Sequence, residues 1–570
     1  MVRGSAVERD VPIPMRDGVV LRADVWRPSS TGRFPVLVYR TPYDRRDAQG
    51  EKSTVARAAE RGYAVVVQDV RGRYGSGGDF EPYRNEGRDG FDTIEWAAAQ
   101  PWSDGSVGTF GLSYPGAVQW LAAVESPPHL KAMVPAMTFS TPRNFFYSGG
   151  VFDMSWGAWI WNNIAPDVRE RRGLAGPRTD EAAWAEWKRI RDPVLRRLPL
   201  EALDEFRDVA PYLFDWMRHP AGDPWWDWAE IRGRYDRVGA AVLNLSGWHD
   251  EAYGPEGALT NFLGLLAARR GQPDARAKLV LGPWVHGGPM RDAAQQSHSG
   301  ERVFGAAAAI DYTDTVLRFM DRYVRGLDNG IDREPAVRAF VMGENAWREA
   351  DRWPLPGTVR RTLVLDGASM PRRPGRLAWG EAPRANGSSS FLSDPARPVS
   401  DPFAADAGAH DYRALAEHED VVTFETETLA DDLRVVGPIT ADIYISTERA
   451  KDVDIWVKLF DVAPDGTAFN LMSPGLDVVR ASSRDGGPRR KLLSPGRVYP
   501  IRFENLMTGN SFRKGHRLRL VVCGAFFPHF SRNLQTGDSE IVSAVSRPDR
   551  ISVHHSVRYP SRLVLPVVGP

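Results

Sequence analysis

The sequence predicts an α/β core with a mostly parallel sheet, an inserted helical cap and a C-terminal all-β region. Apolar strands alternate with helical stretches up to residue 140, and this signal returns from residue 238 to 335. Such alternation is typical of right-handed βαβ units. Between these parts, residues 141–237 read as a helical cap, and short alternating strands fill residues 336–570. We expect the last part to be a β-sandwich of jelly-roll type.

Each strand of the core has its own signal. Residues 11–30 predict a hairpin that turns at Asp17-Gly18, since Asp-Gly is a strong turn signal. Continuous apolar runs at Phe34–Tyr39 and from Tyr63 onward are typical of strands buried on both faces. Further strands are expected at 107–110, 130–137, 240–245 and 277–281, and helices at 51–61, 89–99, 117–124, 257–269 and 313–325.

The predicted cap is unusually aromatic. Nine of the chain's 19 tryptophans lie between residues 141 and 237. Most of these rings are expected to pack against one another in a core of their own.

Length and composition indicate a multidomain globular protein. The 570 residues exceed what one hydrophobic core organises, and 42% are hydrophobic and 26% charged. Lys+Arg and Asp+Glu balance at 73 each, which gives no signal for nucleic acid or an anionic membrane. No apolar run approaches the roughly 18 residues of a membrane span, and no apolar leader is seen, so we expect a cytoplasmic protein. Cys523, the only cysteine, is expected to be a buried thiol.

A strand, a tight turn and a helix meet at Ser113, within the stretch Ser106–Val124. A serine on such a turn holds its hydroxyl clear of the sheet, beside the first amides of the helix. Gly111 and Gly116 allow the strand and the helix to pass close together. Pro115 occupies the second glycine position of the strict G-x-S-x-G pattern, so the pentapeptide alone is a weak signal.

A serine hydroxyl needs a base, and the base needs an orienting carboxylate. Asp250 and His286 both follow predicted buried strands, in the Ser, Asp, His order of α/β-hydrolases. His249 is the rival base, although neighbours on one loop tend to point apart, and Glu251 is the fallback acid. We predict Ser113 as nucleophile, His286 as base and Asp250 as its partner.

The tetrahedral intermediate needs two hydrogen-bond donors for its oxyanion. One candidate is the backbone N–H of Tyr114, directly after the nucleophile. The other is Tyr43, on the loop YRTPYDR after an early strand. The alternative for Tyr43 is a ring packed beneath that loop.

With these residues assembled, the sequence resembles the cocaine-esterase-type (CocE/NonD) hydrolases, which are related to the X-Pro dipeptidyl-peptidases and α-amino-acid ester hydrolases. The form G-x-S-Y-x-G at Ser113 is similar to that family's motif. Other matching segments are RTPYDR, QDVRGRYGSGGDF, EGRDGFDTIEWAAAQPWSDGSVGTFGLSYPG, SGWHDE, GPWVHGG, VGPITADIYIST, DVAPDGTAFNL, FRKGHRLRLVV and FPHFSRN.

The resemblance implies an α/β-hydrolase core with a cap and a jelly roll, and the same triad and oxyanion residues. The family's amino-ester branch carries acidic residues two and three places after the triad aspartate, where this chain has Ala252 and Tyr253. We therefore expect a serine esterase with a small-molecule ester substrate and a pocket lined by Trp156, Trp159 and Tyr253.

Several alternatives stay open. Amides are a further substrate class, and an X-Pro dipeptidyl-peptidase-type aminopeptidase or a β-lactam or amino-acyl ester acylase is the alternative activity. A non-enzymatic carbohydrate-binding protein with a vestigial core is the alternative from another class. No cofactor and no metal are expected, since no H-E-x-x-H or clustered His/Asp pattern occurs. A homodimer is an open hypothesis.

Overall fold

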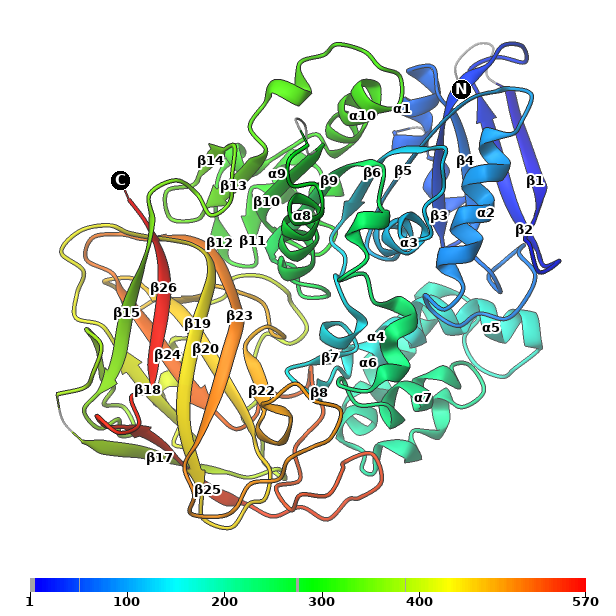
Figure 1. Ribbon diagram of the computed structural model, residues 1–570. Helices are drawn as coiled ribbons and strands as arrows, with labels where there is room; N and C mark the ends of the chain where they lie inside the picture. The colour runs from blue at the N-terminus through cyan, green and yellow to red at the C-terminus, as the bar shows by residue number, and fades with distance from the viewer. Residues whose placement is uncertain (1–5, 51, 273–275, 385, 570) are drawn as a thin grey trace.

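The computed structural model describes residues 6–50, 52–272, 276–384 and 386–569. Within them lie two large sheets, one of ten strands and one of twelve. Figure 1 shows the first sheet with helices against it, the helical cap beside its N-terminal half, and the second sheet next to both. None of the helices in the described residues is both long and apolar enough to cross a membrane.

The first sheet has a parallel centre and antiparallel ends. Its first two strands form the predicted hairpin, and the six central strands pair in parallel in the order β4-β3-β5-β6-β9-β10. This confirms the mostly parallel core. The strands are β1 (Ala6–Pro14), β2 (Val20–Arg27), β3 (Phe34–Thr41), β4 (Ala64–Asp69), β5 (Ser103–Leu112), β6 (Leu130–Ala136), β9 (Ala241–His249) and β10 (Ala277–Val285).

Helices cover both faces of this sheet, which explains why its central strands are mostly apolar. Val36 and Val38 of β3 belong to one hydrophobic core, whereas Leu37 belongs to the other. Successive side chains of a strand point to opposite faces, so a strand between two helical layers has no polar face. The helices α2 (Glu86–Ala98), α3 (Tyr114–Ala123) and α8 (Glu256–Ala268) cover the first face, and α1 (Thr54–Glu60) and α10 (Tyr312–Tyr323) the second.

The first sheet extends beyond the expected limit at residue 335. Strand β13 (Val337–Val341) pairs in parallel with β10, and β14 (Ala346–Ala350) closes the edge. The sequence analysis assigned this stretch to the β-rich region that begins at residue 336. The pairing of β13 with β10 corrects that assignment. Short strands with alternating polarity suit an exposed sheet edge as well as a sandwich, so pattern alone did not separate the two.

The remaining strands, apart from two short pairs, build the all-β second sheet around a separate hydrophobic core. Cys523 ends β24 and is buried, as predicted, and burial raises the pKa of its thiol to about 12. The strands are β15 (Thr358–Asp366), β16 (Gly375–Trp379), β17 (Gly387–Ser393), β18 (Val421–Glu425), β19 (Leu433–Thr447), β20 (Asp454–Val462), β21 (Ala468–Asn470), β22 (Val478–Arg480), β23 (Tyr499–Phe512), β24 (Arg517–Cys523), β25 (Asp549–His555) and β26 (Arg562–Val568).

The cap is helical and packs around its own aromatic side chains, as the sequence predicts. Phe146 lies 4.3 Å from Trp216 and 4.8 Å from Trp226 between ring centroids. A π-helix, Ile160–Ile164, separates two of the helices. The others are α4 (Ser155–Trp159), α5 (Ala165–Arg172), α6 (Asp180–Arg196) and α7 (Tyr212–Arg218), with the short strands β7 (Tyr147–Ser148) and β8 (Val151–Phe152).

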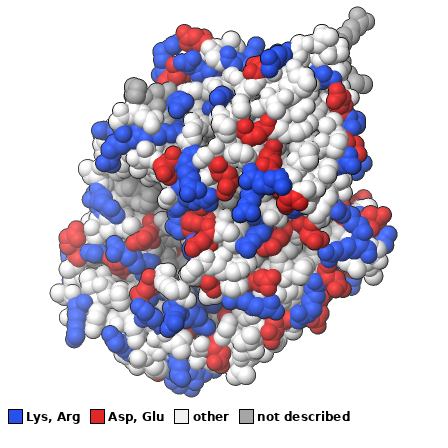
Figure 2. Space-filling model, turned by 45° about the vertical axis from the view of Figure 1, so that its right-hand side comes forward, with Lys and Arg blue, Asp and Glu red and all other residues white. Residues whose placement is uncertain are grey.

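Charges of both signs are interleaved on the surface that Figure 2 shows, where Lys and Arg lie among Asp and Glu in small groups. This view agrees with the equal counts of 73 acidic and 73 basic residues. On this face, no broad region of one sign attracts a polyanion.

A buried arginine joins the second sheet to the cap. The Arg480 guanidinium binds Asp454 at 2.8 Å and Glu540 at 2.8 Å, and all three side chains are buried. Its backbone N–H donates to the Gly149 carbonyl in the cap at 2.8 Å. One cation is therefore the shared counter-ion of two buried carboxylates at the junction.

Replacing Arg480 with Met is expected to destabilise the protein by about 3–5 kcal/mol, because Asp454 and Glu540 would stay buried without their counter-ion. Chemical denaturation followed by tryptophan fluorescence measures this loss. The exposed Arg489, changed to Met, is the matched control and should leave the denaturant concentration at the unfolding midpoint unchanged. An equal midpoint for both variants would contradict a structural role for the junction.

Candidate active site

Ser113 lies on a strained turn between β5 and α3. Its φ is 69° and its ψ is −128°, a combination that non-glycine residues rarely adopt. A Cβ added to Gly111 would lie 2.5 Å from the Pro115 Cβ, and one added to Gly116 would lie 2.5 Å from the Ala136 carbonyl oxygen. Gly111 is thus required by the close passage of β5 and α3, and Gly116 by the close passage of α3 and β6. The surrounding fold holds the serine in this conformation.

Asp250 and His286 meet at the carboxyl ends of β9 and β10, which are adjacent parallel strands. The His286 Nδ1 lies 2.8 Å from the Asp250 Oδ1. That oxygen also accepts hydrogen bonds from the backbone N–H groups of Ala252 at 3.1 Å and Tyr253 at 3.3 Å. Asp250 is 2% exposed, so its orientation is fixed by these donors.

Two opposing effects set the pKa of His286. Burial lowers this pKa, whereas the charge and hydrogen bond of Asp250, followed by the charge of Glu251, raise it. The net result is a pKa above the ordinary 6.5 of histidine. Glu251 itself accepts the backbone N–H of His286 at 2.9 Å, so it holds the loop and does not bind the imidazole there.

Ser113 and His286 each contact Tyr253. The Tyr253 ring lies 5.5 Å from the His286 ring between centroids, and its phenol interacts with the Ser113 hydroxyl. No hydrogen bond joins Ser113 to His286 among those recorded for the described residues. The serine hydroxyl instead lies against the phenols of Tyr253 and Tyr43. Catalytic hydrogen bonds are often loose before substrate binds, and they tighten in the complex.

The predicted oxyanion residues lie on either side of the serine. Tyr43 follows β3, and its phenol accepts a hydrogen bond from Trp159 Nε1 at 2.9 Å. Burial raises the pKa of Tyr43, so the phenol keeps its proton. Tyr114 opens α3, so its backbone N–H precedes the first hydrogen bonds of the helix, which Gly116 and Ala117 donate to the Ser113 carbonyl. Its own phenol donates to Glu86 Oε1 at 2.7 Å and is held away from the reaction.

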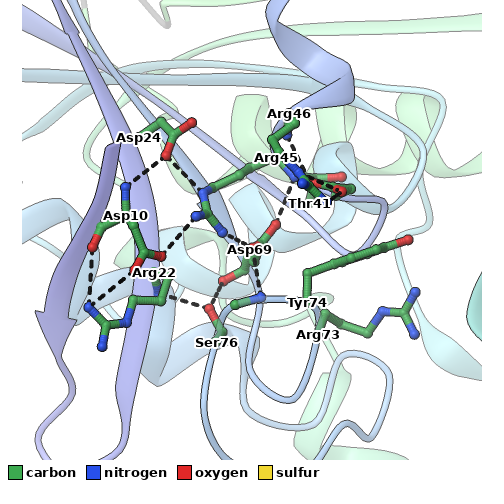
Figure 3. A network of polar contacts seen from close by, with 12 residues as sticks. Asp10, Arg22, Asp24, Thr41, Arg45, Arg46, Asp69, Arg73, Tyr74 and Ser76 are labelled. Atoms are coloured by element: carbon green, nitrogen blue, oxygen red, sulfur yellow. Dashed lines mark hydrogen bonds and ion pairs between the residues drawn. The ribbon is translucent and has the colours of Figure 1, made fainter. Parts of the chain in front are cut away.

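A network of charges, buried except for Asp10, holds the loop that carries Tyr43 (Figure 3). The Arg45 guanidinium binds Asp24 at 3.0 Å and Asp10 at 2.9 Å, and it also pairs with Asp69. The Arg45 backbone N–H donates to Asp69 at 2.7 Å. This network ties the loop after β3 to the end of β4 and to the N-terminal hairpin.

The three predicted pocket residues have different surroundings. Trp156 is buried in the aromatic core of the cap, 4.5 Å from Phe145 between ring centroids. Trp159 and Tyr253 are half-buried and interact with the site itself, through Tyr43 and Ser113 respectively. The rival base His249 is buried, and its Nε2 lies 3.2 Å from the Asn470 carbonyl oxygen; burial lowers its pKa to about 4.

Two residues that the sequence did not single out, Tyr83 and Arg73, contact the residues of the site or their neighbours. Tyr83 places its phenol 3.1 Å from that of Tyr253. Arg73 is fully buried and donates to the Pro42 carbonyl at 2.8 Å, directly before Tyr43. Arg73 lies in the segment QDVRGRYGSGGDF, and Tyr83 lies shortly after it. The family resemblance of this segment was the feature of the sequence that could have indicated both residues.

The catalytic and C-terminal parts of the chain each match a family model. Residues 17–288 match the X-Pro dipeptidyl-peptidase (S15 family) model. Residues 329–564 match the X-Pro dipeptidyl-peptidase C-terminal non-catalytic domain.

Relatives and solved structures span the same length. The chain is 31% identical over 607 residues to a cocaine esterase from Rhodococcus sp., with 100% of both chains covered. An aminopeptidase from a marine sediment archaeon, Thaumarchaeota archaeon, superposes with a TM-score of 0.80 at 23% identity, over 99% of this chain and 97% of that one. An α-amino acid ester hydrolase gives 0.75 at 24% identity, over 99% and 96%. The chain therefore belongs to the cocaine-esterase-type hydrolase family, related to the X-Pro dipeptidyl-peptidases and α-amino-acid ester hydrolases.

Proposed function

We propose that this serine hydrolase cleaves carboxylic esters through an acyl-enzyme formed on Ser113. The observation that supports this most is the 2.8 Å contact between Asp250 and His286 beside a serine held on a strained strand-to-helix turn. In this proposal His286 is the general base, and Asp250 orients it and stabilises its protonated form. The Tyr43 phenol and the Tyr114 N–H stabilise the oxyanion.

The proposed reaction has two matched halves. As the ester enters, the Ser113 hydroxyl leaves the phenols, transfers its proton to His286 Nε2 and attacks the carbonyl carbon. The carbonyl oxygen becomes the oxyanion and accepts hydrogen bonds from Tyr43 and Tyr114. His286 then protonates the departing alcohol, which leaves the acyl group on Ser113. Water repeats the sequence on the acyl-enzyme and releases the carboxylic acid.

Replacing Ser113 with Ala is expected to abolish hydrolysis of p-nitrophenyl butyrate, with kcat falling by about 10⁴-fold or more. Release of p-nitrophenol measures the rate. The exposed Ser30, changed to Ala, serves as the control and should hydrolyse the ester at the wild-type rate. Full activity in the Ser113 variant would overturn the proposal.

The pH profile tests the role of Asp250. His286 accepts a proton only when neutral, so kcat/KM should fall as the pH drops through a midpoint above 6.5. Changing Asp250 to Asn removes the charge that raises this pKa but leaves the burial that lowers it. The midpoint of the residual activity should therefore move to lower pH, with kcat reduced by about 10⁴-fold. An unchanged midpoint would mean that Asp250 does not determine the pKa of His286.

An aminopeptidase activity is the second candidate, because two acidic side chains line the space beside the triad. Asp153 and Glu251 line a cavity of about 20 Å³ together with Asp250 and Tyr253. Burial raises the pKa of Asp153 to about 6, so it is mostly ionised at neutral pH. A carboxylate here is suited to a substrate ammonium, although the volume fits only about one water. Release of p-nitroaniline from Gly-Pro-p-nitroanilide separates this candidate from the esterase.

The finer expectations remain proposals. They are a small-molecule ester as substrate, a cytoplasmic location, a homodimer and a jelly-roll topology for the second sheet. The domain division at 140 and 238 is also kept as a proposal, with the end of the core moved to Ala350 to include β14.

A further inference from the structure

We propose that Trp159 is a positioning residue of the oxyanion hole, which it serves by fixing the direction of the Tyr43 phenol proton. The cap would then supply part of the catalytic machinery as well as a wall of the pocket. This inference rests on the proposed function, because it assigns a role within the same site.

The direction of the hydrogen bond is settled by chemistry. An indole N–H is only a donor, so the Tyr43 oxygen must be the acceptor of the 2.9 Å bond from Trp159. The single phenol hydrogen is then left to point elsewhere, and the Ser113 hydroxyl is a second group that interacts with this phenol. A phenol that accepts one hydrogen bond also becomes a stronger donor through cooperative polarisation. The phenol is therefore oriented before any oxyanion forms.

Trp159 touches the other oxyanion residue as well. Its ring is stacked on that of Tyr114 at 6.2 Å with an interplanar angle of 11°. It also meets Trp156 edge-on at 5.2 Å. These contacts with two neighbouring rings limit the indole to one orientation. A side chain that only lined the pocket would not require a fixed orientation.

The backbone around Trp159 is built to hold this position. The π-helix Ile160–Ile164 begins at the next residue, and such segments are rare and frequently lie at functional sites. Arg73 donates to the carbonyls of Asn163 and Ile164, both at 2.9 Å.

The Arg73 guanidinium also binds the backbone next to Tyr43, the acceptor of the hydrogen bond from Trp159. Arg73 donates to the carbonyl of Pro42, the neighbour of Tyr43, at 2.8 Å. One fully buried cation therefore joins the backbone segments that carry donor and acceptor. An ion pair with Asp167 at 3.2 Å compensates its charge.

A double-mutant cycle tests the inference. Trp159→Phe keeps an aromatic ring but removes the donor, and it should lower kcat for p-nitrophenyl butyrate about tenfold with KM nearly unchanged. Tyr43→Phe should lower kcat by about 10²–10³-fold. In the Tyr43→Phe background, the Trp159 change should alter kcat less than about twofold, because the group that it orients is gone.

The alternatives give different results. If Trp159 only lines the pocket, its replacement will change KM, and its effect will be equally large with and without the Tyr43 hydroxyl; either result overturns the inference. Trp184, exposed on the cap, is changed to Phe as the control and should match the wild type. Rates are compared below the melting temperature of all variants. Failure of the proposed function itself is distinct, since then the Ser113→Ala variant would retain activity.

Discussion

The close passage of β5 and α3 at Ser113 is the constraint on which the rest of the site depends. The serine keeps a φ of 69° only because glycines on both sides allow the strand and the helix to approach each other. The cost of such a conformation is about 1–3 kcal/mol, which the packed sheet must offset. In return the hydroxyl stands at the start of α3, beside the backbone N–H of Tyr114.

The proposed acid, base and phenol donor, Asp250, His286 and Tyr43, come from the ends of different strands. Parallel strands bring their carboxyl ends to one edge, so loops far apart in sequence converge there. Asp250 and His286 come from adjacent strands, and Tyr43 comes from β3 on the other side of β5. Buried charges fix the loops: Arg45 binds three aspartates, and Arg73 ties the Tyr43 loop to the cap. The phenols of Tyr43 and Tyr253 both interact with the Ser113 hydroxyl.

The core and the candidate triad could be predicted because their signals are local. Strands β9 and β10 are mostly apolar and buried throughout. Asp250 and His286 follow their ends directly, so position along the chain was enough to select them. The edge strands β13 and β14 were misassigned since their alternating pattern suits either sheet. The bond from Trp159 to Tyr43 joins residues 116 apart in sequence, and its existence depends on how the cap packs. No local pattern encodes such a contact. The same holds for Arg73, whose three carbonyl partners belong to two separate segments.

A crystal structure of the enzyme inhibited by a fluorophosphonate tests the central claim most directly. The phosphorus should be bonded to Ser113 Oγ, with one phosphonyl oxygen within hydrogen-bond distance of both the Tyr43 phenol and the Tyr114 N–H. His286 Nε2 should lie within hydrogen-bond distance of the adduct, with its Nδ1 still bound to Asp250. An adduct on another side chain, or an imidazole that stays out of reach of the bound group, would contradict the account.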